Sequence, residues 1–197
     1  MSQTVLITGA SNGIGKACAR VFARKGYDLV LVARHREKLE AVKAELSEYD
    51  VQIKVIAMDL TGEDAAVDLY NNLVLDDISI DILVNNAGFG DHGAFHDSSW
   101  EKQKKMVLLN IVALMQMTYV FGQSMKRRKK GRILNVASIA GLCAGPYMST
   151  YYATKAFVLS FSESIDYELK DYNVEVSCLC PGPTKTGFMD VANLGQS

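Results

Sequence analysis

The chain has 197 residues, of which 49% are hydrophobic and 22% are charged, and its formal net charge at pH 7 is −1. This length and composition are typical of one globular domain, spanning 1–197, with a sizeable core. The near-neutral charge argues neither for nucleic acid nor for an acidic partner, so we expect no nucleic-acid partner. No apolar run approaches the roughly 20 residues that a membrane span requires.

Short apolar runs alternate along the chain with longer amphipathic segments. We expect strands at 4–8, 28–33, 51–57, 80–84, 132–136 and 174–179, and helices at 14–25, 36–49, 63–75, 98–125 and 150–171. Most of these strands are apolar on both faces, as buried parallel strands are. The alternation predicts an α/β fold, a doubly wound parallel sheet between two layers of helices (the Rossmann fold). Ligands of such sheets bind beyond the carboxyl ends of the strands, where the glycine and polar clusters of this chain fall.

A glycine-rich turn joins the first expected strand to the first expected helix. The turn contains Gly9, Ser11, Asn12, Gly13, Ile14 and Gly15, in the spacing T-G-x-x-x-G-x-G. Glycine permits a tight turn and a close approach to a ligand. A helix N-terminus offers unpaired N–H groups and a partial positive charge to a pyrophosphate. The turn therefore predicts a dinucleotide site, and the alternative is a purely structural glycine turn.

The second expected strand ends at Ala33 and Arg34, where a dinucleotide site usually carries an acid that binds the ribose 2′-hydroxyl. An arginine there can bind a 2′-phosphate instead. This favours NADP(H) over NAD(H), unless Arg34 merely begins the next helix in solvent. Asp59, after the third strand, can accept a hydrogen bond from an adenine amino group or cap the following turn.

Tyr151 and Lys155 stand four residues apart in an expected helix. That spacing places both side chains on one helix face. An ammonium beside a phenol favours the phenolate, so we expect the pKa of Tyr151 to lie below its usual value near ~10. Such a phenol can give or take a proton near neutral pH, although the same pair also suits an ordinary helix face.

These residues belong to a longer ordered set. In chain order it is Thr8-Gly9-x-x-x-Gly13-x-Gly15, Asp59, Asn85-Asn86-Ala87-Gly88, Asn110, Ser138, Tyr151-x-x-x-Lys155 and Pro181-Gly182. The set covers essentially the whole chain and resembles the short-chain dehydrogenase/reductase (SDR) family in its single-domain branch.

The resemblance implies an oxidoreductase that interconverts a carbonyl and an alcohol. Tyr151 is then the general acid in reduction and the base in oxidation. Lys155 lowers the pKa of Tyr151 and binds the nicotinamide ribose, and Ser138 holds the substrate oxygen. Asn110 holds a water in a proton relay behind Lys155; without the resemblance, this asparagine is read as a hydrogen-bonded core amide or an exposed helix residue.

The resemblance also implies a set of cofactor-binding residues. They are Gly9, Ser11, Asn12, Gly13, Ile14, Gly15, Arg34, Asp59, Leu60, Asn85, Ala87, Gly88, Tyr151, Lys155, Pro181, Gly182 and Thr186. Pro181, Gly182 and Thr186 flank the nicotinamide, and Asn86 bridges strand ends. The cofactor supplies the hydride, and the protein supplies position and the proton.

The family pattern continues with a substrate-covering segment, a further helix and a seventh strand, whereas this chain stops at Ser197. We therefore expect the C-terminal part of the family fold to be missing from it. In the family, the helices at 98–125 and 150–171 commonly contact a second subunit, which predicts a homodimer or homotetramer.

Two stretches after strand ends, 89–95 and 142–148, are expected to line the substrate pocket. The second is mainly apolar, which predicts a lipophilic ketone or aldehyde as the small-molecule substrate. We interpret His92 and His96 as loop residues, because no partner is near them in sequence.

Two other classes of protein remain open. A regulatory protein that binds NADP(H) without turnover needs the glycine turn but not Asn110, Ser138, Tyr151 and Lys155. A sugar-nucleotide epimerase or dehydratase of the extended branch resembles T-G-x-x-G-x-x-G at the first turn, which differs from the spacing here.

The four cysteines form no C-x-x-C pair, and no histidine cluster accompanies them. Their spacing predicts no metal site, and free thiols fit a reducing compartment. The first residues run directly into an apolar strand without the charged and apolar regions of a signal peptide. We therefore expect a cytoplasmic protein.

Overall fold

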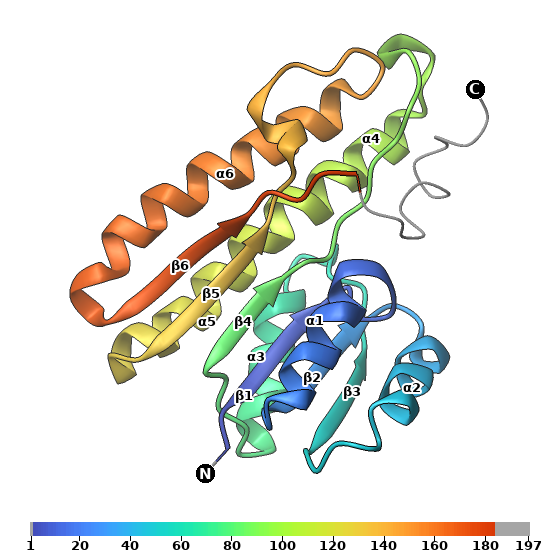
Figure 1. Cartoon of the computed structure of the whole chain (residues 1–197). Coiled ribbons are helices and arrows are strands. Elements are labelled where there is room, and N and C mark those ends of the chain that lie inside the picture. Colours follow the sequence, from blue (N-terminus) through green and yellow to red (C-terminus); the bar gives the residue numbers. More distant parts are fainter. Residues whose placement is uncertain (1, 184–197) are drawn as a thin grey trace.

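The computed structural model describes residues 2–183 of the chain (Figure 1). Six strands form one parallel sheet in the order β3-β2-β1-β4-β5-β6. The strands are β1 (Thr4–Thr8), β2 (Asp28–Ala33), β3 (Ile53–Ala57), β4 (Ile82–Asn85), β5 (Gly131–Val136) and β6 (Val174–Leu179). The strand order reverses between β1 and β4, which confirms the predicted doubly wound arrangement.

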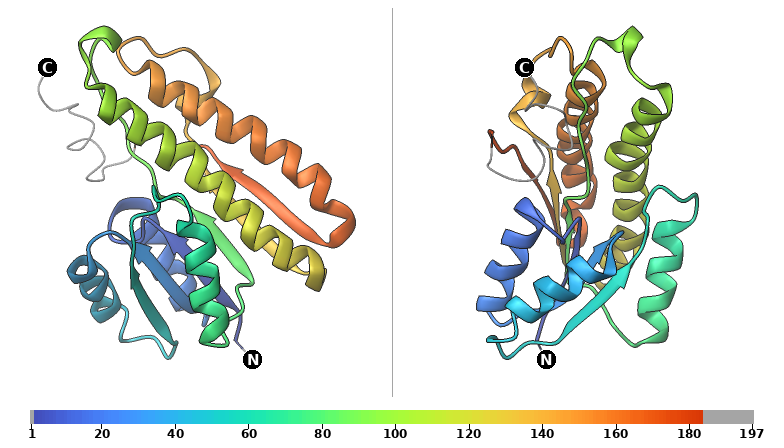
Figure 2. Two further views of the ribbon diagram at one scale, coloured as in Figure 1. Left: turned by 180° about the vertical axis from the view of Figure 1, so that it is seen from behind. Right: turned by 90° about the vertical axis from the view of Figure 1, so that its right-hand side faces the viewer.

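Helices cover both faces of this sheet, as the two views of Figure 2 show. They are α1 (Gly13–Arg24), α2 (Arg36–Glu45), α3 (Ala65–Leu75), α4 (Trp100–Val107), α5 (Leu114–Arg128) and α6 (Ser149–Leu169). Four shorter helical segments are η1 (Phe95–Asp97), η2 (Leu108–Ala113), η3 (Ile139–Leu142) and η4 (Lys170–Tyr172). The cores on the two faces contain α1 and α2 on one side and α3, α5 and α6 on the other.

Side chains along each strand alternate between these two cores, as the pleat of a strand requires. In β1, Val5 and Ile7 face α1 and α2, while Leu6 faces α3 and α5. All three side chains are fully buried. The continuous apolar runs of the sequence therefore correspond to strands with a helix layer on each side.

The helix expected at 98–125 is a single continuous helix over Trp100–Arg128. It is not regular throughout, because its middle segment η2 is a π-helical stretch that contains Asn110. By length and composition alone it could cross a membrane. Met117 and Phe121 are almost completely buried in the core on the sheet, so its apolar face forms part of the domain interior.

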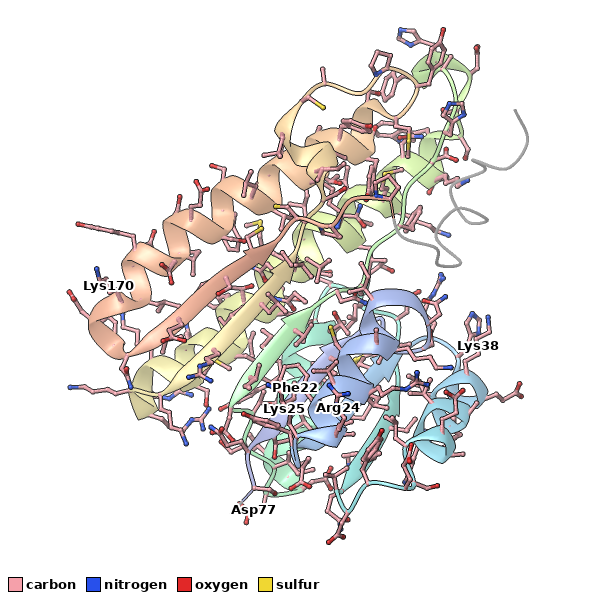
Figure 3. All side chains as sticks on the ribbon, in the orientation of Figure 1. Phe22, Arg24, Lys25, Lys38, Asp77 and Lys170 are labelled. Carbon is pink, nitrogen blue, oxygen red and sulfur yellow. The ribbon has the colours of Figure 1, made fainter. Side chains whose placement is uncertain are left out.

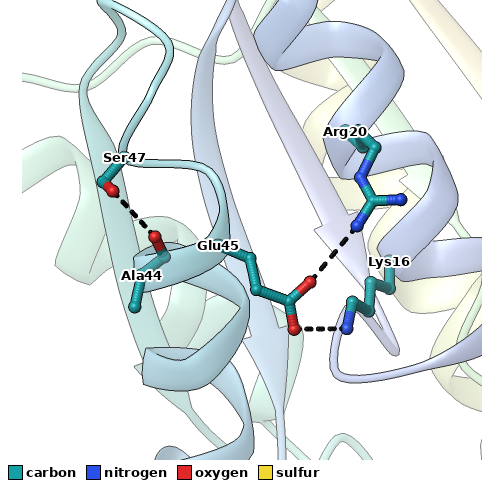
Figure 4. Close-up of polar contacts among 5 residues, drawn as sticks. All are labelled: Lys16, Arg20, Ala44, Glu45 and Ser47. Carbon is teal, nitrogen blue, oxygen red and sulfur yellow. Dashed lines mark hydrogen bonds and ion pairs between the residues drawn. The ribbon is translucent and has the colours of Figure 1, made fainter.

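An ion-pair cluster joins α1 to α2 at the periphery. Glu45 accepts hydrogen bonds from Lys16 Nζ at 2.6 Å and from Arg20 Nη2 at 3.2 Å (Figure 4). The hydrogen bond from Lys16 is the main reason that the pKa of the Glu45 carboxyl is lowered. These side chains are exposed, so the pairs contribute little to stability. Other charged side chains, such as Lys38 and Lys170, point outward (Figure 3).

A run of basic residues, 126–130, lies at the end of α5 and in the turn that follows it. Arg128 donates a hydrogen bond to the Ile80 carbonyl oxygen at 2.6 Å, and Lys126 Nζ lies 4.1 Å from the centre of the Tyr172 ring. Lys129 adopts a left-handed conformation with φ 51° at the C-cap. The protein itself therefore provides contacts for several members of this cluster.

Candidate active site

The four residues predicted to be catalytic come from three separate segments. Tyr151 and Lys155 lie in the first turns of α6, Ser138 follows β5, and Asn110 lies in η2. Asn110 is 1% exposed, Lys155 6% and Tyr151 8%. Burial of two ionisable groups in one region changes their proton affinities and marks the region as a candidate site.

Lys155 Nζ donates a hydrogen bond to the Val136 carbonyl oxygen at 2.7 Å and lies 5.8 Å from the centre of the Tyr151 ring. Burial lowers the pKa of Lys155 to about 8, so the ammonium is still charged at pH 7. Burial also raises the pKa of the Tyr151 phenol. The prediction of a lowered Tyr151 pKa is therefore wrong for the free protein, because desolvation of the phenolate outweighs the favourable contacts.

The Ser138 hydroxyl is held at the ends of two neighbouring strands. It accepts a hydrogen bond from the Ala140 N–H at 3.1 Å and donates one to the Pro181 carbonyl oxygen at 3.5 Å. The same hydroxyl hydrogen can instead be donated to Tyr151, and this hydrogen bond favours the phenolate and so opposes the effect of burial on the pKa of Tyr151. An oxygen atom placed beside these two hydroxyls could contact both.

Asn110 is fixed by hydrogen bonds to the loop after β4. Its Oδ1 accepts from the Phe89 N–H at 3.1 Å, and its Nδ2 donates to the Phe89 carbonyl oxygen at 2.9 Å and to Thr154 Oγ1 at 3.1 Å. A Cβ atom added to Gly88 would lie 3.0 Å from Asn110 Oδ1 and 3.7 Å from Lys155 Nζ. The two predicted catalytic side chains therefore converge on Gly88. That Asn110 holds a water stays a prediction.

The loops after β1 and β4 are hydrogen-bonded to each other beside the glycine turn. Thr8 Oγ1 accepts from the N–H groups of Asn86 and Ala87, both at 3.0 Å. Asn86 Nδ2 donates to the carbonyl oxygens of Thr8 at 3.0 Å and Gly9 at 3.1 Å. These bonds confirm that Asn86 bridges strand ends, and they join the two halves of the sheet where the strand order reverses.

Gly9 and Gly15 permit the close approach of chain segments in this turn. Gly9 has φ +64°, and a Cβ atom there would lie 2.8 Å from Asn86 Nδ2; a Cβ atom on Gly15 would lie 2.3 Å from the Gly9 oxygen. Asn12, at the N-cap of α1, makes no side-chain capping hydrogen bond. The first N–H groups of α1 and the positive end of its dipole are thus suited to a phosphate ligand.

Arg34 lies directly after β2 and is exposed. Its charge contributes to a lowered pKa of Asp59, although the larger cause is the hydrogen bond from the Thr61 N–H. Asp59 Oδ1 accepts from Thr61 N at 3.0 Å and Thr61 Oγ1 at 2.9 Å. Of the two roles considered for Asp59, the structure shows the capping of the following turn.

The other predicted cofactor-binding residues are placed as follows. Ser11, Gly13 and Ile14 lie at the turn into α1, Leu60 follows β3, Ala87 and Gly88 follow β4, and Pro181 and Gly182 follow β6. Thr186 lies outside the residues that the structure describes. Among residues 2–183, no group of His, Cys, Asp and Glu side chains is arranged to hold a metal ion. The glycine turn, the uncapped helix and Arg34 together fit a dinucleotide.

Asn85 was predicted to bind cofactor, and its side chain points into the protein. Its Nδ2 donates to Thr118 Oγ1 at 3.1 Å and to Asn135 Oδ1 at 2.9 Å, and Asn135 Nδ2 donates to Ser162 Oγ at 2.9 Å. This buried network connects β4, β5, α5 and α6 and was missed in the sequence. Its visible signal is an asparagine at 135, directly after the apolar residues Ile133 and Leu134 of β5.

Apolar side chains pack with Tyr151 in a small cluster of the protein interior. They are Phe89, Met106, Ala140, Met148 and Tyr152. The two loops predicted to line the pocket also touch, since the Gly93 N–H donates to the Tyr147 carbonyl oxygen at 2.8 Å and the His92 and Tyr147 rings lie 6.0 Å apart.

The family model described as short chain dehydrogenase matches residues 3–196. The chain therefore belongs to the short-chain dehydrogenase/reductase family, and its members interconvert alcohols and carbonyls with NAD(P). The chain is 35% identical to nodulation protein G of Rhizobium sp. (strain N33) over 194 residues, which are 97% of this chain and 77% of that protein.

Two solved structures have the same fold. The short-chain dehydrogenase from Sphingobium yanoikuyae in complex with NADPH has a TM-score of 0.91 and 37% identity, covering 97% of this chain and 75% of that one. The bulky-bulky ketone specific alcohol dehydrogenase from Comamonas testosteroni has a TM-score of 0.87 and 37% identity, covering 93% and 74% of the two chains. The protein is thus an NAD(P)-dependent oxidoreductase of this family.

Proposed function

We propose that the protein is an NADP(H)-preferring oxidoreductase that interconverts a lipophilic ketone or aldehyde and its alcohol. The observation that carries this proposal is the arrangement of three side chains. The Tyr151 phenol is hydrogen-bonded to the Ser138 hydroxyl and lies one helical turn from the buried Lys155 ammonium. A carbonyl oxygen between the two hydroxyls would receive a proton from Tyr151 while Ser138 stabilises its developing charge. The bound cofactor would supply the hydride.

The preference for NADP(H) rests on Arg34. Its guanidinium is exposed directly after β2, where an acidic residue would bind the ribose hydroxyl of NAD(H). A guanidinium binds a phosphate with charge-assisted hydrogen bonds. The Sphingobium yanoikuyae structure contains NADPH, which supports the same choice of cofactor here.

The preference for a lipophilic carbonyl rests on the apolar surroundings of Tyr151. Phe89, Met148 and Tyr152 pack against its ring, and Leu142, the last residue of η3, is 65% exposed. Apolar side chains around a few polar groups are typical of small-molecule sites. The similarity to the alcohol dehydrogenase from Comamonas testosteroni, which is named as specific for bulky-bulky ketones, supports this substrate class.

The experiment is NADPH oxidation against a panel of lipophilic ketones, aldehydes and diketones, with NADH in parallel. Tyr151→Phe should abolish turnover, whereas the neighbouring Tyr152→Phe should retain it. Arg34→Glu should weaken NADPH binding and leave NADH binding unchanged, with Arg24→Glu at the far end of α1 as control. Tight NADPH binding without turnover on any carbonyl would contradict the proposed reaction, and a preference for NADH would contradict the role of Arg34.

We also propose that the protein is a homodimer or homotetramer. On the outer side of α5, Val112 just before it, Met115 and Tyr119 are 47%, 41% and 66% exposed. Their spacing of three and four residues forms one apolar stripe on a helix, and exposed apolar patches mark contact sites. Light scattering after gel filtration tests this, and a monomeric mass at micromolar concentration would contradict it.

A further inference from the structure

We propose that Thr154 is a positioning residue that sets Asn110 relative to Tyr151 in the active site. It is not expected to touch substrate or cofactor, and it acts through its two hydrogen-bond partners. Its importance for turnover rests on the function proposed above, whereas its structural link between α6 and η2 does not.

The Thr154 hydroxyl lies between the two predicted catalytic residues. Its oxygen accepts a hydrogen bond from Asn110 Nδ2 at 3.1 Å, and its own hydrogen is donated to the Tyr151 carbonyl oxygen at 2.7 Å. Thr154 and Asn110 are each only 1% exposed. One buried hydroxyl therefore joins the π-helical segment η2 to the first turn of α6 without a solvent alternative.

The contact with Thr154 completes the hydrogen bonding of the Asn110 side chain. Both hydrogens of Nδ2 are used, one on the Phe89 carbonyl oxygen at 2.9 Å and the other on Thr154, while Oδ1 accepts from the Phe89 N–H. Without the Thr154 oxygen, one buried N–H would lose its acceptor and the amide would have to turn. The amide also lies close to Gly88, where an added Cβ atom would be only 3.0 Å from its Oδ1.

A second hydroxyl of α6 provides a matched control. Ser162 is also 1% exposed, accepts from an asparagine, Asn135 Nδ2, at 2.9 Å, and donates to the Val158 carbonyl oxygen of its own helix at 2.6 Å. The two hydroxyls thus have the same burial and the same type of bonds. They differ in partner, since Asn135 belongs to the sheet interior and Asn110 to the active site.

The test compares Thr154→Val with Ser162→Ala, each of which removes only the hydroxyl function. Both should lower the melting temperature by a similar amount. Thr154→Val should reduce kcat by roughly tenfold to a hundredfold with little change in KM, as small misplacements of catalytic groups do, and should shift the midpoint of the pH profile of kcat. Ser162→Ala should keep the wild-type kcat and pH profile, and Thr154→Ser should restore both.

Hydrogen exchange provides a readout that needs no turnover. In Thr154→Val, amide exchange should increase together at 107–114 and at 149–156, and in Ser162→Ala it should not. If the wild type shows no turnover, only the proposed function is contradicted. The hydrogen-exchange result would then still test whether Thr154 links α6 to η2. The inference is overturned if Thr154→Val keeps the wild-type kcat and pH profile, or if the two segments exchange as in the Ser162→Ala variant.

Discussion

Replacing Lys155 with methionine should make the free protein more stable at pH 7, although it removes a residue of the proposed chemistry. Lys155 is 6% exposed, and burial of its ammonium lowers its pKa to about 8. Between pH 8 and the unfolded value of 10.5, the unfolded chain binds more protons than the folded one. The cost of holding the charge is therefore fully present below pH 8 and is gone above pH 10.5.

The size of the expected stabilisation follows from the change in the pKa of Lys155. A fall from 10.5 to about 8, at ~1.4 kcal/mol per pKa unit, corresponds to about 3 kcal/mol below pH 8. The hydrogen bond from Lys155 Nζ to the Val136 oxygen at 2.7 Å is lost in the variant and offsets ~1 kcal/mol. The net gain of about 2 kcal/mol should raise the melting temperature by roughly 4–8 °C in a domain of this size.

Thermal unfolding of Lys155→Met and wild type, measured at pH 7 and near pH 10.5, tests this reasoning. The gain at the lower pH should shrink towards zero or reverse at the higher pH, as the folded wild type loses its buried charge. Lys38→Met, at an exposed position on α2, should change the melting temperature little at either pH. A variant that is less stable than wild type at pH 7, or a gain independent of pH, would refute the argument.

Three further predictions concern the cofactor turn, the core and the surface. Gly15→Ala places a Cβ atom 2.3 Å from the Gly9 oxygen, so the turn must move. The affinity for NADPH, measured by fluorescence titration, should therefore fall by more than about tenfold. An unchanged affinity would contradict the described turn. Phe121→Ala, at a core position 2% exposed, should cost about 3–5 kcal/mol in urea unfolding. Glu45→Gln removes the exposed pairs with Lys16, and its melting temperature should match wild type in high salt.

The sheet could be predicted from the sequence because its strands are buried on both faces and read as unbroken apolar runs. The first and last residues of the strands were harder to predict. The strand expected at 51–57 begins at Ile53, and that expected at 80–84 covers Ile82–Asn85. Pairing between strands decides these ends: Leu29 pairs with Ile53, and Asn85 with Asn135. Such long-range partners are absent from a local pattern.

The candidate site was partly predictable for a similar reason. Residues at strand ends, such as Ser138 and Asn86, could be assigned to one edge because parallel strands all end there. The π-helical segment at Asn110 and the bonds of Thr154 depend on side chains from other elements. The raised pKa of Tyr151 was missed because it depends on burial, and spacing along a helix carries no information on how deeply a phenol lies in the protein.

The hydrogen bonds between the loops after β1 and β4 connect two consecutive halves of the chain. Arg34 and the glycine turn come from the half that ends with β3, whereas Ser138, Tyr151 and Lys155 come from the half that begins with β4. The residue proposed to choose the nucleotide and those proposed to act on the carbonyl thus lie in separate blocks of sequence that meet at Thr8 and Asn86. Grafting the first block from a related NAD-dependent enzyme, with Thr8 and Asn86 kept, should exchange the cofactor and preserve the range of carbonyls reduced.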